Sequence, residues 1–253
     1  MSAASETELL ETAVRAALIA RDHLRERASR GVVSSREHDI KLVADLEGDR
    51  LLVEFLRSQT GIPILSEEGG WTSGGESLLE TGSCWIVDPL DGSFNFDRGI
   101  PLAAVSIGLW KNGSPVLGVV SDIFRDDVFS GSISEGLTVN GTSANVSSVT
   151  EMKNAVLCTG LPVAGSFDVE SLTKWASELG SYKKVRYLGS AALSLAYVAS
   201  GRADVYKERG IRIWDVAGGL ALVMAGAGAS NVTRMSSPTT LDVSASNGRV
   251  RAS

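Results

Sequence analysis

The chain has few residues that could build disulfides or zinc centres. Among its 253 residues are only two cysteines, Cys84 and Cys158, and two histidines, His23 and His38. This number excludes a disulfide framework, and a Cys/His zinc site would require all four residues to converge from distant positions. Both cysteines lie in apolar runs, so we interpret them as buried thiols of a reducing compartment.

The sequence also lacks an excess of positive charge and a long apolar run. Its 24 Lys and Arg residues stand against 30 Asp and Glu, a net charge of −6, which excludes the broad basic surface of a nucleic-acid or membrane-surface binder. The longest apolar stretch, 216–229, is interrupted by glycines and is shorter than the roughly 20 residues of a membrane span. Acidic Glu6, Glu8 and Glu11 occupy the region where a signal peptide would be basic. We therefore expect a cytoplasmic protein that binds no nucleic acid polymer and no membrane.

The first half of the chain predicts two helices followed by antiparallel strands. Ser5 and Glu8 have the spacing of a capping box for the first helix, and a second helix is expected over about 46–59. Between 85 and 129 apolar residues alternate with small ones, and Asn112-Gly113 is typical of a hairpin turn. This region is therefore predicted to be a meander of mostly antiparallel strands.

After residue 150, helical and strand patterns alternate, with helices expected over 169–179 and 191–200 and a third beginning at Asp215. Hydrophobic residues make up 43% of the chain and charged residues 21%, enough for a globular core. The predicted fold class is α/β, a layered sandwich with helices covering both sheets. We expect an N-terminal α+β subdomain, 1–147, that carries an antiparallel sheet and a metal site, and a C-terminal α/β subdomain, 148–253.

The strongest chemical signal is an apolar strand that ends in two carboxylates, Asp88 and Asp91. A proline and a glycine bend the backbone there, so that both carboxylates and the Leu90 carbonyl could converge on one hard cation such as Mg²⁺. Gly92 and Ser93 leave backbone N–H groups open to a phosphate. Taken alone, the segment is more typical of a solvent-exposed turn than of a metal site, because Asp, Pro and Gly are common turn residues.

Further carboxylates stand at element ends elsewhere in the chain. Glu67 and Glu68 follow a short apolar strand, where a solvated loop is the alternative interpretation. Asp215 precedes an apolar helix and Asp45 precedes the second helix, and both have the position expected of an N-cap. A hydrogen bond from the Ser93 hydroxyl to Asp45 would create a pair able to orient and deprotonate a water molecule.

Taken together, these segments resemble the inositol monophosphatase family of Mg²⁺-dependent, Li⁺-sensitive phosphatases. The resemblance lies in Trp85-Ile-Val-Asp-Pro-Leu-Asp-Gly-Ser-Phe-Asn-Phe96 and Trp214-Asp-Val-Ala-Gly-Gly219, and it is supported by Pro101-Leu-Ala-Ala-Val-Ser-Ile-Gly108 and Gly201-Arg-Ala-Asp204. It implies alternating α-β-α-β-α layers, like those of fructose-1,6-bisphosphatase, and a homodimer.

The resemblance also implies a ligand set for Mg²⁺. One ion would be bound by Glu67, Asp88 and the Leu90 carbonyl, and a second by Asp88, Asp91 and Asp215. A third, weaker ion would lie near Glu67.

The remaining site residues are likewise implied by the resemblance. Ser93 and Asp45 match the hydroxyl and the carboxylate that position the attacking water, which displaces the alcohol directly without a phosphoenzyme. Phosphate would contact the backbone N–H groups of Gly92 and Ser93. The substrate's alcohol would contact Asp91, Ser190, Ala191 and Glu208.

The substrate itself stays open at this point. An inositol monophosphate or a similar polyol or sugar phosphate fits best, but Leu42 stands where the family usually has threonine, in a segment that borders the site. The alternatives within the superfamily are a 3′(2′),5′-bisphosphate nucleotidase, a histidinol-phosphatase and a fructose-1,6-bisphosphatase. The alternative from another class is a catalytically silent protein that binds a phosphate ligand.

Overall fold

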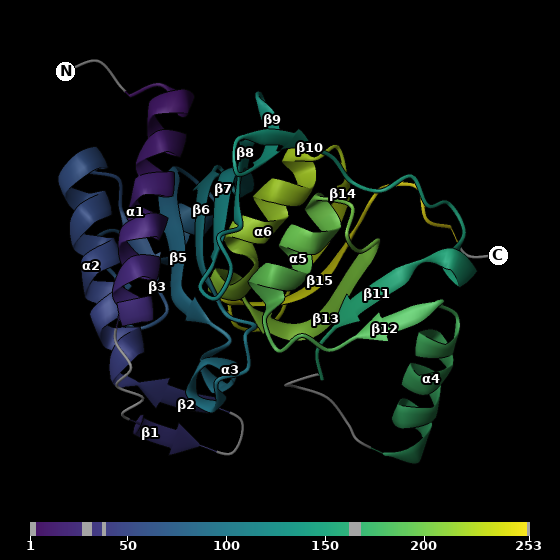
Figure 1. Cartoon of the computed structure of the whole chain (residues 1–253). Coiled ribbons are helices and arrows are strands. Elements are labelled where there is room, and N and C mark those ends of the chain that lie inside the picture. The colour runs from purple at the N-terminus through teal and green to yellow at the C-terminus, as the bar shows by residue number, and fades with distance from the viewer. Residues whose placement is uncertain (1–3, 27–31, 37–38, 162–167, 252–253) are drawn as a thin grey trace.

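Helices and sheets alternate in five layers (Figure 1), which confirms the predicted layered α/β sandwich and the layer order that the resemblance implies. The computed structural model describes residues 4–26, 32–36, 39–161 and 168–251. Two long helices cover one face of a large sheet, two central helices separate this sheet from a smaller one, and a fifth helix lies beyond the smaller sheet. In this order the layers contain α1 (Glu6–Glu26) and α2 (Val43–Thr60), the large sheet, α5 (Ala191–Ala199) and α6 (Ile213–Ala225), the small sheet, and α4 (Val169–Gly180).

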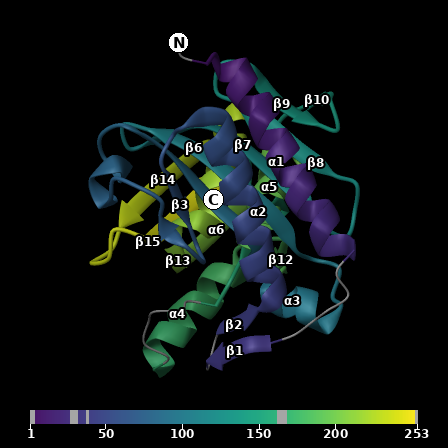
Figure 2. The same cartoon turned by 90° about the vertical axis from the view of Figure 1, so that its left-hand side faces the viewer.

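The outer helices α1 and α2 run side by side across the large sheet (Figure 2). The predicted capping box of α1 is confirmed: the Ser5 backbone N–H donates to Glu8 (2.7 Å), and the Glu8 N–H donates to the Ser5 hydroxyl (3.3 Å). Helix α2 ends at Gly61, which adopts the left-handed φ of 64° that a glycine C-cap provides.

The prediction that Asp45 and Asp215 are N-cap residues is wrong. Helix α2 begins at Val43 and α6 at Ile213, so Asp45 and Asp215 are each the third residue of their helix. The N-cap residues are Leu42 for α2 and Arg212 for α6, both with extended backbone. The Leu42 N–H donates to the Asp45 carboxylate (2.5 Å), and the Arg212 N–H donates to the Asp215 carboxylate. A third-position carboxylate satisfies a free N–H at the helix start as an N-cap does, and the sequence pattern does not separate the two.

The large sheet has eight strands in the order β10-β9-β8-β7-β6-β5-β3-β4. Its pairs are antiparallel except for β3 and β5, which run parallel, so the residues that follow both strands meet at one edge. Asn112 and Gly113 form the predicted hairpin turn with positive φ. The strands are β3 (Ile64–Ser66), β4 (Gly70–Trp71), β5 (Ser83–Asp91), β6 (Ala104–Lys111), β7 (Ser114–Asp122), β8 (Val128–Ser132), β9 (Gly136–Val139) and β10 (Thr142–Ala144).

The smaller sheet has five strands in the order β12-β11-β13-β15-β14, with β11 parallel to both of its neighbours. Its strands are β11 (Val156–Thr159), β12 (Lys184–Arg186), β13 (Val205–Arg212), β14 (Ala229–Arg234) and β15 (Thr240–Ser246). Outside the two sheets lie a short hairpin, one short helix and two 3₁₀ turns. These are β1 (Val32–Arg36), β2 (Asp39–Leu42), α3 (Ser93–Arg98), η1 (Glu76–Leu79) and η2 (Met152–Asn154).

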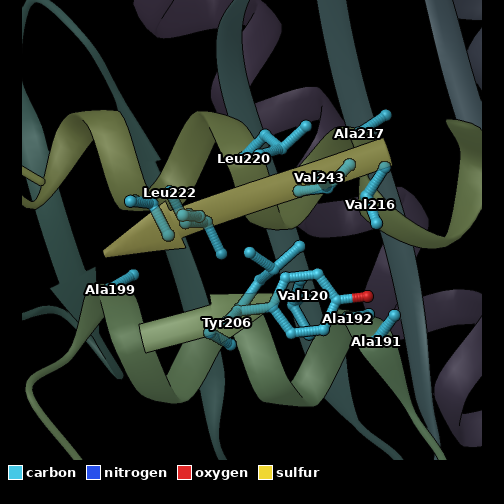
Figure 3. Close-up of a cluster of buried hydrophobic side chains, with 14 of the residues drawn as sticks. Val120, Ala191, Ala192, Ala199, Tyr206, Val216, Ala217, Leu220, Leu222 and Val243 are labelled. Atoms are coloured by element: carbon cyan, nitrogen blue, oxygen red, sulfur yellow. The ribbon is translucent and has the colours of Figure 1, made fainter. Parts of the chain in front are cut away.

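The largest hydrophobic cluster fills the space around α5 and α6 (Figure 3), where Leu220 of α6 packs with Val120 of the large sheet and with Tyr206 and Val243 of the smaller one. Each fully buried side chain of this size contributes roughly 1.5–3 kcal/mol. Both cysteines are buried and free, as expected, whereas His38 lies outside the described residues.

Helix α6 approaches the large sheet at backbone distance. A Cβ atom at Gly108 would lie 2.7 Å from the Ala217 carbonyl carbon, and one at Gly118 would overlap the carbonyl of Gly218. Only glycine fits at these two sheet positions. The contact of Gly108 and Gly118 with the backbone of α6 sets the distance of this helix from the sheet, and with it the position of Asp215. Among the helices that the structure describes, α6 included, none combines the length and apolar character needed to cross a membrane.

Candidate active site

Three carboxylates from three elements meet at the edge of the large sheet. Glu67 follows β3, Asp88 lies near the end of β5, and Asp215 is in the first turn of α6. One carboxylate oxygen from each residue lies within 4.8 Å of the others, a spacing at which they could hold a metal ion. The parallel pairing of Ser66 with Val87 brings the first two together, since the next residues on the two strands are Glu67 and Asp88.

The carboxylates of this cluster are strongly perturbed. Burial, reinforced by the charges of Glu67 and Asp91, raises the pKa of Asp88 well above its usual range, and the pKa of Asp215 rises for the same reasons. Burial raises the pKa of Glu67 to about 8. Within the described residues, no lysine, arginine or histidine pairs with these carboxylates. Buried carboxylates that have no cationic partner either bind protons or require a metal cation.

Asp91 lies beside this cluster but faces another element. Its carboxylate accepts hydrogen bonds from the Ser190 hydroxyl and from the Ala192 backbone N–H (2.9 Å), both at the start of α5. Burial raises the pKa of Asp91 to about 6, although these hydrogen bonds act in the opposite direction. Asp91 therefore stands between the acidic cluster and the N-terminus of α5, outside the compact group of three.

The structure brings Asp45 and Ser93 together across 48 residues of sequence. The Ser93 hydroxyl lies 3.2 Å from Asp45 Oδ1 and 2.9 Å from the Leu90 carbonyl oxygen, and it can donate to either. The second Asp45 oxygen accepts the Leu42 N–H. Asp45 is thus held at the start of α2 with one oxygen directed at Ser93, and the Leu90 carbonyl also faces this hydroxyl.

Gly92 and Asn95 shape the turn between β5 and α3. Gly92 has a φ of 89°, and a Cβ there would lie 2.8 Å from the Leu102 carbonyl oxygen, so a side chain is excluded by both strain and space. The Asn95 side-chain amide donates to the carbonyls of Leu102 (2.9 Å), Leu188 (2.8 Å) and Gly189 (3.3 Å). The sequence reasoning assigned Asn95 no role, and its only signal was its place in the motif.

A cavity of about 250 Å³ adjoins Asp91. It is lined by four of the predicted substrate residues, whereas Gly92 and Ser93 lie outside its lining. The lining residues are Asp91, Thr159, Gly160, Leu161, Gly189, Ser190, Ala191, Ser194, Glu208 and Ile211. We call this cavity the substrate pocket.

The carboxylate of Glu208 is held in place within this pocket. The buried Tyr206 hydroxyl donates to Glu208 Oε2 (2.9 Å), and the Gly160 N–H also donates to this carboxylate. Burial raises the pKa of Glu208 to about 7. The sequence reasoning missed Tyr206 and Gly160. The contact of Gly160 depends on the placement of β11 beside β13, whereas Tyr206 lies two residues before Glu208 on β13 and its signal was this period-two spacing.

The layered fold and the all-oxygen cluster define an α/β protein with a candidate divalent-metal site. The family model for the inositol monophosphatase family matches residues 5–252. The chain therefore belongs to this family, whose members are Mg²⁺-dependent phosphatases of inositol phosphates.

Individual relatives agree with this assignment. A Nus factor SuhB from Xylella fastidiosa is 34% identical over 203 residues, which cover 79% of this chain and 72% of that protein. An inositol-1-monophosphatase from Mesorhizobium japonicum is 37% identical over 176 residues, which cover 69% of this chain and 65% of that protein. The chain thus spans about two thirds of the length of the curated inositol-1-monophosphatase it matches.

A solved structure supports the fold over nearly the full length. The inositol monophosphatase from Anabaena superposes with a TM-score of 0.80 at 32% identity, covering 95% of this chain and 90% of that one.

Proposed function

We propose that the protein is a Mg²⁺-dependent phosphomonoester hydrolase acting on inositol monophosphate or a similar polyol or sugar phosphate. The observation that carries this proposal is the meeting of Glu67, Asp88 and Asp215 at the edge of the large sheet. Asp88 is buried and the other two are half-buried, and none has a cationic partner among the described residues. Such a cluster is costly to maintain unless a cation occupies it.

The donor set fits Mg²⁺, which prefers carboxylate and carbonyl oxygens. Glu67, Asp88 and the Leu90 carbonyl would hold one ion, and Asp88, Asp91 and Asp215 a second. When bound, Mg²⁺ supplies positive charge that stabilises the phosphate and the leaving oxygen.

Ser93 and Asp45 would act on the attacking water. With its hydroxyl proton directed to Asp45, the Ser93 oxygen is free to accept a proton of the water, and Asp45 then takes the proton that the hydroxyl gives up. The water oxygen bonds to phosphorus as the bond from phosphorus to the alcohol oxygen breaks. The departing oxygen takes a proton from solvent and Asp45 returns its proton to solvent, which leaves inorganic phosphate and a free alcohol. The backbone N–H groups of Gly92 and Ser93 would contact the phosphate during this step.

The substrate pocket would bind the alcohol. Asp91 and Glu208 offer carboxylate oxygens to its hydroxyl groups, while Ser190 and Ala191 leave room beside them. The nucleotidase, histidinol-phosphatase and fructose-1,6-bisphosphatase activities are the alternatives for the same chemistry. We further propose a cytoplasmic, Li⁺-sensitive homodimer built from the subdomains 1–147 and 148–253.

Phosphate release with and without Mg²⁺ tests the proposal. The substrates are inositol 1-phosphate, adenosine 3′,5′-bisphosphate, histidinol phosphate and fructose 1,6-bisphosphate. We expect Mg²⁺-dependent release with a preference for inositol 1-phosphate. Asp91→Asn should lower kcat at least 10³-fold with the fold intact, whereas the exposed control Asp22→Asn should retain wild-type activity.

Two results would contradict the proposal. Near-normal activity of Asp91→Asn would refute its metal assignment. Absence of release from every substrate, with Mg²⁺ binding demonstrated by calorimetry, would favour the catalytically silent phosphate-binding protein instead. Glu208→Ala should weaken discrimination among the substrates, and an equal loss on all of them would refute its role in specificity.

A further inference from the structure

A second cavity, of about 510 Å³, lies between α4 and the outer face of the smaller sheet. We call it the α4 cavity. Its volume is about twice that of the substrate pocket and falls in the range of small-molecule sites. Thr159, Gly160 and Glu208 form the wall that the two cavities share, and the Glu208 carboxylate fills the space beside the Gly160 backbone. The α4 cavity is therefore a space of its own, on the far side of Glu208 from the carboxylate cluster.

Helix α4 presents an apolar face to this cavity. Leu172, Trp175 and Leu179 recur at helical spacing, so they lie on one face of the helix, and all three line the cavity. No residue of α4 is buried, whereas nearly every residue of α5 is, so the apolar face of α4 is not packed onto the sheet. Trp175 packs at a steep angle against Tyr187, with 6.1 Å between ring centroids, which holds the indole ring at the cavity wall.

The opposite wall of the α4 cavity is polar. Strands β14 and β15 contribute two directly paired sets of polar side chains to it, Asn231 with Ser244 and Thr233 with Asp242. The period of two along each strand places all four on the same face of the sheet. In the described parts of the chain, the side chains of Asn231, Thr233 and Ser244 have no hydrogen-bond partner. The two walls do not complement each other, because hydroxyl and amide groups find no partner in an indole ring and leucine side chains.

The charges in the lining are balanced. Three cationic side chains stand against three carboxylates: Lys174, Lys207 and Arg209 against Glu178, Glu208 and Asp242. Lys207 and Glu178 pair directly with each other at 2.6 Å. The lining thus favours neither an anion nor a cation, while its polar side chains can both donate and accept hydrogen bonds.

A saccharide or cyclitol ring has the two kinds of surface that these walls require. Its C–H groups form an apolar face that can pack on an indole ring, and its hydroxyl groups both donate and accept hydrogen bonds at the ring edge. We propose that the α4 cavity is a second ligand site, for an uncharged saccharide or cyclitol whose ring stacks on Trp175 and whose hydroxyl groups bond to Asn231 and Thr233. This inference is independent of the proposed phosphatase function, because it involves neither the carboxylate cluster nor a reaction.

Equilibrium binding of uncharged sugars to the metal-free protein tests the site. By isothermal titration calorimetry in EDTA, at least one of glucose, maltose and myo-inositol should bind with a Kd of about 1 mM or below. Trp175→Leu removes the stacking surface and should raise this Kd at least ten-fold. Thr233→Val removes one hydroxyl at nearly constant shape and should raise it several-fold. The same substitution at Thr173, an exposed α4 residue outside the lining, is the matched control and should leave the Kd unchanged.

Two further measurements test the charge and the place of the ligand. Glucuronate and glucosamine add a negative and a positive charge to the glucose ring, and neither should bind more tightly than glucose. Ser190→Ala changes the substrate pocket alone, because Ser190 does not line the α4 cavity, and it should leave the Kd unchanged.

Four results would overturn the proposal. One is the absence of binding by all three uncharged probes at tens of millimolar. Another is an equal Kd for the wild type, Trp175→Leu and Thr233→Val. Tighter binding of either charged sugar would refute the uncharged ligand class, and a loss of binding in Ser190→Ala would place the sugar in the substrate pocket instead.

Discussion

Removing divalent metal should make the protein less stable as the pH rises from 5 to 8. Burial raises the pKa values of Glu67, Asp88, Asp91 and Asp215, to about 8 for Glu67 and about 6 for Asp91, and repulsion from neighbouring carboxylates adds to the effect at all of them except Asp91. In the unfolded chain these groups lose their protons near pH 4. Between pH 4 and the raised pKa values, the folded state binds more protons than the unfolded state. The free energy of unfolding therefore falls as the pH rises through this range.

The size of the effect follows from the number of protons retained. One proton held across three pH units corresponds to about 4 kcal/mol, at 1.36 kcal/mol per unit. Such a loss is a large fraction of the roughly 5–15 kcal/mol that stabilises a typical domain. Saturating Mg²⁺ should displace this proton, add about 2.7 kcal/mol at one hundred times its Kd, and flatten the dependence on pH.

Urea unfolding at pH 5, 6, 7 and 8, in EDTA and in Mg²⁺, measures this effect. Asp88→Asn is the matched variant, because it removes one buried charge at nearly constant shape. In EDTA at pH 8 it should be more stable than the wild type, although it should lose phosphatase activity. A wild type that in EDTA is as stable at pH 8 as at pH 5 would refute the reasoning, since the carboxylates would then share no proton.

Substitutions at three further positions test the geometry around α3. Gly92→Ala forces a Cβ toward the Leu102 carbonyl at a φ of 89° and should cost at least about 1–2 kcal/mol, seen as a lower melting temperature; an unchanged Tm would contradict the close contact. Ser93→Ala should lower kcat roughly 10²-fold or more, while Ser93→Thr, which keeps the hydroxyl, should remain within several-fold of wild type; equal kcat values for the two would rule out the hydroxyl's role. Asn95→Ala leaves three carbonyls without their donor and should destabilise the protein by about 1–3 kcal/mol in urea unfolding; a loss below 0.5 kcal/mol would show that water replaces the amide.

Local patterns predicted most of the fold. The capping box at Ser5, the turn at Asn112-Gly113 and the alternation after residue 150 depend on neighbouring residues alone, so they can be read from the sequence. The N-cap assignments of Asp45 and Asp215 failed because a carboxylate at the third helical position satisfies the same N–H groups.

The identity of the site carboxylates could be predicted, because they lie in sequence motifs. The contacts that position them were harder to predict, because they come from distant segments of the chain. The roles of Asn95 and Gly160 depend on contacts with Leu188 and with Glu208, far away in the chain. The engagement of Asp91 with the start of α5, rather than with the compact acidic cluster, likewise depends on how α5 packs. No spacing rule within one segment encodes such contacts.

The backbone contact between α6 and the glycines of β6 and β7 has a consequence for sequence drift. Where helices meet sheets through interlocking side chains, each core substitution shifts the helix slightly and displaces whatever it carries. Here Gly108 and Gly118 set the separation by main-chain atoms, which mutations elsewhere in the core leave unchanged. Substitutions among the surrounding leucines and valines should therefore leave the position of Asp215 unchanged. The hydrophobic core can then vary in sequence while the acidic cluster keeps its geometry.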